Sequence, residues 1–526
     1  MTQPVLIDGH WRQPKDPAGS FQPESPVVAT KLPEVYPVSG FKDLEHAVQA
    51  SMKAVQECHQ SDPQERAEFL DRFAENIEQT ADTLVKTASM ETGLPIEPRL
   101  KSVELPRTTG QLRQAAAAVR DRSWCRCIID TKLNIRSMYA SLGGPVVVIG
   151  PNNFPLAFNA VSGGDFAAAI AAGNPVIAKA HPSHPGTTKA LAETAFQALQ
   201  KTSLPRSMVQ MVYHMHPASG LRLVSHPQVA ATSFTGNKAA GLRLKESAEK
   251  AGNLIYLEMS SINPVIILPG AVRERGPEIA GELFASCTLG MGQFCTNPGV
   301  VIYVGGHAGK NFTVSVREKF CEEPKGVLLS KEVIRGLKIS LRRLQDSGAR
   351  LLEGGKPPRG EGYRFQNTLL KISGKEYLKS PDELQTEAFG PSTLLVEAED
   401  VTQIMKIIET LEGNLTGTIY SHSGDRDNQD YQRIEPLLRR KVGRLLNNKM
   451  PTGVAVTPAM HHGGPFPASG HPGFTSVGIP PAIWRFAAVH AYDHVREDRL
   501  PHELRDKNPT GKMWRYIDGT WSQRDI

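Results

Sequence analysis

The chain has 526 residues, and its 60 Lys+Arg against 54 Asp+Glu leave a formal net charge of +6. Hydrophobic residues make up 40% and charged residues 22%, an ordinary globular composition. The length exceeds what one core usually supports, so two or three domains are expected. The small basic excess, with no long basic run, argues against a nucleic-acid-binding role.

The N-terminal residues 1–9 do not resemble a signal peptide, and no stretch approaches the ~20 apolar residues of a membrane span. The cysteines lack the paired spacing of zinc sites. We therefore expect a cytoplasmic protein of a reducing compartment, with no membrane contact and no bound metal. The six cysteines are Cys58, Cys125, Cys127, Cys287, Cys295 and Cys321.

Amphipathic periodicity predicts three N-terminal helices over residues 43–60, 63–91 and 97–122, with Asp43 capping the first. Residues 122–141 look like a strand-rich insertion. From Gly144 onward, apolar strands alternate with helices. The predicted strands span 146–149, 176–178, 208–213, 231–234 and 254–257, and the predicted helices span 155–172, 187–200, 219–225 and 238–250.

This alternation predicts a parallel, doubly wound sheet that binds its ligand at the carboxyl ends of the strands. A second α/β region is expected over residues 263–447. The Gly-, Pro- and His-rich residues 451–481 are expected to carry little regular structure, and segments of that kind are usually functional or packed against a partner.

Cys295 lies in a short loop, Gly-Gln-Phe-Cys-Thr-Asn-Pro-Gly, that is suited to presenting a nucleophile. Glu258 ends an apolar strand upstream, where a carboxylate can activate water. A nucleophile and a base are two parts of one covalent mechanism. An isolated free cysteine is more often a small buried hydrophobe, but the flanking residues favour a nucleophile here.

Four further positions offer weaker signals. Asn153 follows the first strand of the sheet, where its amide can stabilise an oxyanion or form an Asx turn. Lys179 ends the next strand and can hold a ribose or phosphate, or be a solvated lysine. Gly236 begins a P-loop-like spacing that lacks the Lys-Ser/Thr pair, so it marks a phosphate site at a helix N-terminus or only a tight turn. Glu387, near Phe389, can accept hydrogen bonds from ribose hydroxyls or be only an ordinary residue at the start of a loop.

In this order along the chain, these residues resemble the aldehyde dehydrogenase superfamily over nearly the whole length. The resemblance implies an α/β fold with a doubly wound parallel-sheet cofactor domain, an α/β catalytic domain and a small oligomerisation element. The cofactor domain would comprise residues 1–122 and 142–258, and the catalytic domain residues 259–450. Residues 123–141 and 451–526 would bridge subunits of a homodimer or homotetramer.

The same resemblance implies the roles of individual residues. Cys295 would be the nucleophile, Glu258 the general base and Asn153 the oxyanion donor. The cofactor residues would be Lys179, Ser183, Phe234, Thr235, Gly236, Asn237, Glu387 and Phe389.

Several motifs narrow the resemblance to the 2,5-dioxovalerate (α-ketoglutarate semialdehyde) dehydrogenases, with NADP-dependent fatty aldehyde dehydrogenases as more distant relatives. The motifs include residues 154–158, 162–165, 179–187, 258–264, 462–468 and 475–478. The implied reaction is irreversible oxidation of a semialdehyde to 2-oxoglutarate through a cysteine thioester.

Three departures bear on specificity. Pro182 stands where NAD-preferring members often have a glutamate, so we expect NADP, with NAD possible. Asn237 replaces a common serine. Residues 469–474 lack the arginine expected before Thr-Ser-Val-Gly, and Pro467, Pro472 and Phe474 would add apolar surface there.

Three alternatives stay open: the same chemistry on a fatty or other aldehyde, acyl transfer to coenzyme A, and a catalytically silent homologue with a binding or structural role.

Overall fold

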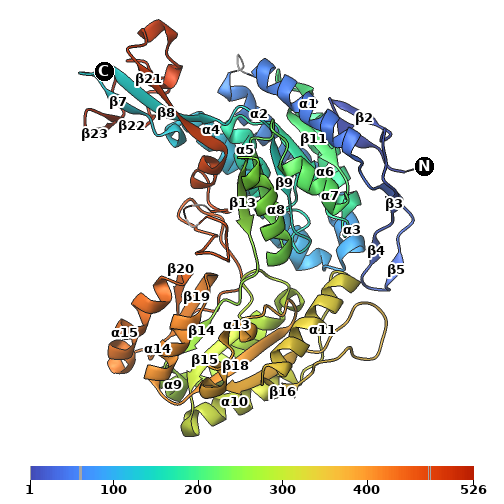
Figure 1. The fold of residues 1–526 in the computed structure, drawn as a ribbon, viewed down its shortest axis with the longest axis vertical. Helices are drawn as coiled ribbons and strands as arrows, with labels where there is room; N and C mark the ends of the chain where they lie inside the picture. The colour runs from blue at the N-terminus through green and yellow to red at the C-terminus, as the bar shows by residue number, and fades with distance from the viewer. Residues whose placement is uncertain (1, 59–61, 472, 474) are drawn as a thin grey trace.

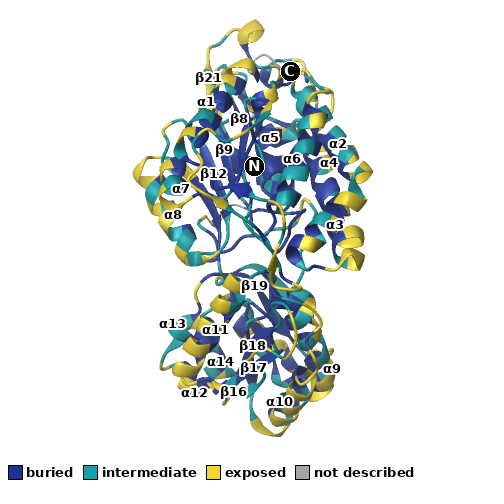
Figure 2. Ribbon diagram, turned by 90° about the vertical axis from the view of Figure 1, so that its right-hand side faces the viewer, coloured by how far each residue is buried: buried dark blue, intermediate teal, exposed yellow. Residues whose placement is uncertain are grey.

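The computed structural model describes residues 2–58, 62–471, 473 and 475–526. Two α/β bodies lie one above the other, and a strand-rich arm projects from the upper one (Figure 1). The strands of both bodies are largely buried, whereas many outer helices keep an exposed face (Figure 2). In the described part of the chain, no helix is both long and apolar enough to cross a membrane.

The upper body is built on a seven-stranded sheet in the order β13-β12-β9-β10-β11-β1-β2. The strands β9 to β13 run parallel, β1 pairs antiparallel with β11, and β2 pairs antiparallel with β1 at the edge of the sheet. The central strand β9 is almost entirely apolar and buried, as a strand covered on both faces must be. The strands are β1 (Val5–Ile7), β2 (His10–Arg12), β9 (Val146–Ile149), β10 (Val176–Lys179), β11 (Val209–Val212), β12 (Ala231–Thr235) and β13 (Leu254–Glu258).

The helices of this body are α1 (Phe41–Cys58), α2 (Pro63–Gln79), α3 (Ala81–Thr92), a π-helical segment Ile96–Glu104, α4 (Leu105–Asp121), α5 (Gly164–Ala172), α6 (Pro185–Leu199), α7 (Pro217–Val224) and α8 (Lys238–Lys250). Two short ribbons precede them: β3 (Ser20–Phe21) pairs with β6 (Tyr36–Pro37), and β4 (Glu24–Ser25) pairs with β5 (Thr30–Lys31).

Four helix predictions need correction. The predicted helix over 63–91 is two helices, because Thr80 leaves the helical region and caps α2. The predicted helix over 97–122 becomes regular only from Leu105. Glu97 is extended, as the residue before a proline prefers. Asp43 does not cap α1, because it accepts the backbone N–H groups of Lys15 and Asp16 from within the first turn.

The fourth correction concerns the predicted helix over 155–172, of which only α5 forms. The buried carboxylate of Glu104 accepts the backbone N–H groups of Leu156 (2.8 Å) and Ala157 (3.0 Å). Asn159 holds the turns that follow by donating to the carbonyl of Pro155 and accepting from Val161. These contacts take the place of helical hydrogen bonds, so the segment forms a loop beside the cavity described below. The predicted end of the first helix at Gln60 lies outside the described residues.

The lower body contains a second seven-stranded sheet, in the order β16-β17-β18-β15-β14-β19-β20, which is parallel except for β16. Its strands are β14 (Val265–Ile267), β15 (Val300–Val304), β16 (Arg350–Glu353), β17 (Thr368–Ser373), β18 (Ser392–Ala398), β19 (Asn414–Tyr420) and β20 (Val442–Asn447). Its helices are α9 (Pro269–Thr288), α10 (Gly306–Phe320), α11 (Lys331–Asp346), α12 (Gly374–Tyr377), α13 (Pro381–Leu384), α14 (Val401–Thr410) and α15 (Asn428–Arg439).

The arm is a five-stranded sheet made of the predicted insertion and the C-terminal segment. Its strands, in spatial order, are β21 (Ala487–Asp493), β8 (Ile135–Ser141), β7 (Ile128–Asp130), β22 (Arg515–Ile517) and β23 (Thr520–Ser522). The described residues of 451–480 contain neither helix nor strand beyond an isolated bridge from Ser469 to Glu258. The predicted α/β architecture is confirmed.

Candidate active site

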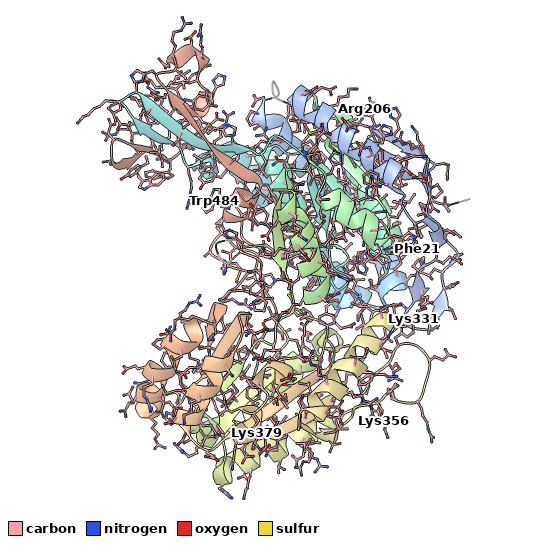
Figure 3. All side chains as sticks on the ribbon, in the orientation of Figure 1. Phe21, Arg206, Lys331, Lys356, Lys379 and Trp484 are labelled. Atoms are coloured by element: carbon pink, nitrogen blue, oxygen red, sulfur yellow. The ribbon has the colours of Figure 1, made fainter. Side chains whose placement is uncertain are left out.

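A cavity of about 870 Å³ is lined by residues of both bodies. The upper body contributes the segments that follow β9, β10, β12 and β13, which is the edge where an open parallel sheet binds ligands. The lower body contributes α11 and the loops that carry Cys295, Glu387 and Phe389. Phe21 and Lys331, two further lining residues, are labelled in Figure 3. The volume suits a dinucleotide with a small substrate.

The backbone around Cys295 is held by one asparagine side chain. Asn263 Nδ2 donates to the carbonyl oxygens of Cys295 and Asn297, each at 2.8 Å. The side-chain oxygen of Asn263, Oδ1, accepts in turn from Thr416 Oγ1 at 2.9 Å. The half-buried thiol therefore projects from a fixed loop into the cavity. By contrast, Cys287 is fully buried in α9, as expected for a cysteine that acts only as a small hydrophobic residue.

Glu258 ends β13 with its carboxylate buried and each of its oxygens hydrogen-bonded. Oε1 lies 2.9 Å from His462 Nε2, and Oε2 accepts from Ser476 Oγ at 2.7 Å. Burial alone would raise the pKa of Glu258, but the charge and hydrogen bond of His462 and the Ser476 hydroxyl outweigh it and hold that pKa below its usual value. Glu258 is thus kept ionised inside the protein.

His462 is the site residue that sequence reasoning missed. Its Nε2 also lies 3.3 Å from Cys295 Sγ, so one ring nitrogen serves the thiol and the carboxylate together. Burial, and then the neighbouring Glu258 charge, raise the pKa of the Cys295 thiol well above its usual value. A thiol with a raised pKa needs a proton acceptor beside it, and the His462–Glu258 pair, whose carboxylate also hydrogen-bonds to the thiol, stands at that position.

The ligand atoms of Glu258, Cys295 and His462 all lie within 4.8 Å of one another. Cys, His and Glu are also zinc ligand types, so the group has the composition of a metal site. In this structure the three side chains hydrogen-bond to one another instead. The expected absence of metal stays a prediction.

Asn153 is buried at the cavity wall, with its amide next to the loop that carries Cys295. Nδ2 donates to the carbonyl of Gln293 at 2.9 Å, and the Asn153 backbone carbonyl accepts from Arg99 at 3.0 Å. An asparagine amide has two N–H groups, so one remains for an oxyanion formed at Cys295.

The cofactor residues predicted from sequence fall into two groups. Lining the cavity are Ser183, Thr235, Gly236, Asn237, Glu387 and Phe389. Lys179 and Phe234 are absent from that lining. Lys179 sits at the end of β10, where burial lowers its pKa to about 8, and Phe234 packs in a small apolar core with Leu257 and Met259.

The turn after β12 leads directly into α8. Asn237 caps that helix by accepting the N–H of Ala240 at 2.9 Å. A Cβ placed on Gly236 would lie 2.7 Å from the Phe234 ring, so the turn needs a glycine. The free N–H groups at this helix start favour a phosphate. Glu387 also lines the cavity, and burial raises its pKa to about 7 despite hydrogen bonds from Ser260 and Ser261.

The irregular segment after residue 451 is attached to the edge of β13. Met259 N donates to the carbonyl of Ala468 at 2.7 Å, and Gly470 N donates to the carbonyl of Leu257 at 2.9 Å. This pairing holds His462 beside Glu258. The apolar surface predicted from Pro472 and Phe474 lies outside the described residues.

The sequence pattern of the Aldehyde dehydrogenase family matches residues 11–471. Alpha-ketoglutaric semialdehyde dehydrogenase 2 of Azospirillum brasilense is 37% identical over 487 residues, covering 90% of this chain and 91% of the relative. Alpha-ketoglutaric semialdehyde dehydrogenase of Acinetobacter baylyi is 34% identical over 492 residues, covering 91% and 92%.

Solved structures agree on the fold. A mutant aldehyde dehydrogenase C of Pseudomonas syringae, in complex with NAD+ and octanal, has a TM-score of 0.79 at 19% identity, covering 94% of this chain and 96% of that one. Lactaldehyde dehydrogenase of Escherichia coli has a TM-score of 0.78 at 21% identity, covering 93% and 98%. The chain therefore belongs to the aldehyde dehydrogenase family and is an NAD(P)-dependent enzyme that oxidises aldehydes.

Proposed function

We propose that this enzyme oxidises α-ketoglutarate semialdehyde (2,5-dioxopentanoate) to 2-oxoglutarate through a thioester on Cys295. The observation that carries the chemistry is the chain of contacts from Cys295 through His462 to Glu258. The substrate rests on the two semialdehyde dehydrogenases that match along about nine-tenths of both chains.

In the first half-reaction, Cys295 passes its proton to the His462–Glu258 pair and the sulfur adds to the aldehyde carbon. The two side chains, which lie 2.9 Å apart, hold this proton until it passes to solvent, and Glu258 is then ionised for the second half-reaction. The free N–H of Asn153 and the backbone N–H of Cys295 donate to the oxyanion.

The second half-reaction belongs to Glu258. A bound NAD(P)+ would supply the oxidant, as the acceptor of the hydride from the thiohemiacetal carbon, and a thioester on Cys295 would remain. Glu258 then takes a proton from water, whose oxygen attacks the thioester carbonyl. The carboxylic acid is released, and the Cys295 sulfur keeps the electrons of the broken C–S bond as a thiolate. A base placed 2.9 Å from the group that activates the thiol favours hydrolysis over acyl transfer to coenzyme A and argues against a silent homologue.

We assign the dinucleotide to the cavity with its pyrophosphate at the N-terminus of α8, over Thr235, Gly236 and Asn237. Glu387 and Phe389 would then hold the nicotinamide side, with Phe234 shaping the turn from below. Lys179 and Ser183 would hold the adenosine side.

NADP is the proposed preferred cofactor, with NAD accepted. Among the described cavity residues after β10, which are His181, Pro182 and Ser183, no carboxylate repels a 2′-phosphate. Fluorescence titration with NADPH and NADH, together with kcat/KM for each oxidised cofactor, tests this assignment. Pro182→Glu should weaken the binding of NADPH more than that of NADH. A strong preference of the wild-type enzyme for NAD would contradict the proposed NADP preference.

A fatty aldehyde is the second candidate substrate. The wall beside Cys295 is aromatic, because Phe154 packs edge-on against both Phe158 and Phe294. Steady-state turnover on α-ketoglutarate semialdehyde, pentanal and octanal separates the two candidates. A higher kcat/KM for the neutral aldehydes would reject the semialdehyde proposal and leave the covalent mechanism intact.

We propose the same domain division as from the sequence: residues 1–122 and 142–258 form the cofactor-binding domain, and residues 259–450 form the catalytic domain. The arm, from 123–141 and the C-terminal part of 451–526, is proposed to join subunits of a homodimer or homotetramer.

A further inference from the structure

Two arginines, one from the upper body and one from the lower body, donate hydrogen bonds to the same short stretch of chain, residues 451–454. Arg107 on α4 donates through Nη1 to the carbonyl of Val454 at 3.0 Å. Arg444 on β20 donates through Nη2 to the carbonyls of Pro451 at 2.8 Å and Gly453 at 3.0 Å. The two guanidinium groups therefore lie on either end of the same stretch.

This stretch is itself tied to the nucleophile loop. Gly453 N donates to Thr296 Oγ1 at 3.2 Å, and Thr296 directly follows Cys295. Thr452 Oγ1 accepts from Ser286 Oγ at 2.7 Å and fixes the stretch against α9. The Cys295 thiol acts on the pKa of both arginines, and Arg107 lies behind the aromatic residues that line the cavity.

Both guanidinium groups have unused donors. The Nε and Nη2 atoms of Arg107 and the Nε atom of Arg444 are shielded from solvent and, among the described residues, have no hydrogen-bond acceptor. Burial lowers the pKa of each arginine. A buried charged donor without a partner is unfavourable unless a ligand supplies the acceptor.

Carboxylates of the protein do not fill this role in the described chain. Glu104, the nearest candidate, forms its ion pair with Arg99 and accepts the N–H groups of Leu156 and Ala157. Arg107 instead lies against the rings of Phe154 and Phe158, 5.4 and 4.9 Å from their centroids. Those two rings line the cavity that holds Cys295.

We propose that Arg107 and Arg444 form the subsite that holds the carboxylate at the far end of the substrate. This inference rests on the proposed semialdehyde function and deepens it. A dicarboxylate semialdehyde has its aldehyde at one end and an anionic, planar acceptor at the other. A guanidinium group can bind such an acceptor through two parallel hydrogen bonds, so the pair selects an anionic aldehyde over a neutral one.

The test compares Arg107→Gln and Arg444→Gln with Arg113→Gln, a control on the same helix whose guanidinium pairs with the half-exposed Glu78. The substrates are α-ketoglutarate semialdehyde and pentanal. We expect the first two variants to lose about 10- to 100-fold in kcat/KM for the semialdehyde, mainly through KM, the range of a hydrogen bond to a charged group. Pentanal should stay within about twofold, Arg113→Gln should match wild type, and Arg107→Lys should recover part of the loss. A parallel loss for both aldehydes, or no loss for the semialdehyde, would overturn the subsite.

A binding measurement separates the subsite from the proposed function. Calorimetry with glutarate, an unreactive dicarboxylate, should show binding to the wild-type holoenzyme and loss of binding in Arg107→Gln. If wild type prefers pentanal yet binds glutarate through Arg107, the semialdehyde function fails and the carboxylate subsite stands. If wild type prefers the semialdehyde but glutarate binds equally to both proteins, the subsite fails and the function stands.

Discussion

His462 Nε2 lies 2.9 Å from Oε1 of Glu258, although 204 positions separate the two residues in the sequence. The contact exists because the irregular segment after residue 451 pairs with the edge of β13, at the end of which Glu258 sits. The same imidazole nitrogen faces Cys295 Sγ at 3.3 Å. The predicted nucleophile and the predicted base are thereby linked through a third side chain that contacts both.

Replacing His462 should slow the first half-reaction. His462→Gln removes one member of the His462–Glu258 pair that accepts the thiol proton, and the raised pKa of Cys295 leaves little thiolate at neutral pH. We expect the rapid burst of NAD(P)H in stopped-flow measurements to slow by about 100-fold, the lower range for a general base. The effect should shrink as pH rises, because the thiol then ionises without help. His461→Gln, at the neighbouring position, is the control, and an equal loss there would mean that the variant perturbs the segment.

Cys295→Ala should abolish aldehyde oxidation and leave cofactor binding unchanged, because the sulfur forms the covalent intermediate. Cys287→Ala should keep full activity, since that thiol is buried in α9 and donates weakly to the carbonyl of Pro298 at 3.6 Å. Turnover and NADPH fluorescence, measured on both variants, decide the assignment. Residual oxidation by Cys295→Ala, or an equal loss in Cys287→Ala, would move the nucleophile elsewhere.

Glu258→Gln should separate the two half-reactions. Glutamine keeps the contacts to His462 and Ser476 but cannot accept a proton from water. We therefore expect a burst of one equivalent of NAD(P)H, loss of steady-state turnover, and an acyl adduct on Cys295 in the intact-mass spectrum. A missing burst together with a missing adduct would show that Glu258 acts before hydrolysis.

Cys295, Glu258 and the glycine turn at Gly236 could be predicted because their signals are local. Each is a residue type at the end of an apolar strand or inside a tight loop. The sequence places His462 in a motif but does not indicate its role, because that role depends on strand-edge pairing between distant segments. The failed helix over 155–172 has the same cause. Its Ala-rich sequence favours a helix, but the buried Glu104 captures the N–H groups of Leu156 and Ala157.

Cofactor affinity should depend on pH through Glu387. Burial raises the pKa of this carboxyl to about 7, so it is protonated below that pH and ionised above it. An ionised carboxylate accepts ribose hydroxyls better than a protonated one. We expect the Kd for NADPH to rise as pH falls below about 7 and to level off above about 8. Glu387→Gln should bind weakly with a flat profile over the same range, and a flat wild-type profile would remove Glu387 from the ribose site.

The arm predicts a symmetric homo-oligomer. It combines β8 with β21, β7 and the C-terminal β22 and β23 into a sheet that stands away from the upper body (Figure 1). Large apolar side chains on it are exposed, including Ile128 (51%), Val489 (58%) and Trp521 (53%). An exposed sheet with such side chains invites pairing with another chain, and closed symmetry satisfies that tendency without fibre growth.

Light scattering at micromolar concentration should therefore give a mass of two or four subunits rather than 57.4 kDa. Val489→Arg places a charge on the outer strand β21 and should shift the mass toward the monomer. Ile339→Arg, on the equally exposed α11 in the lower body, is the matched control and should leave the mass unchanged. A wild-type monomer, or dissociation by both variants alike, would contradict an interface at the arm.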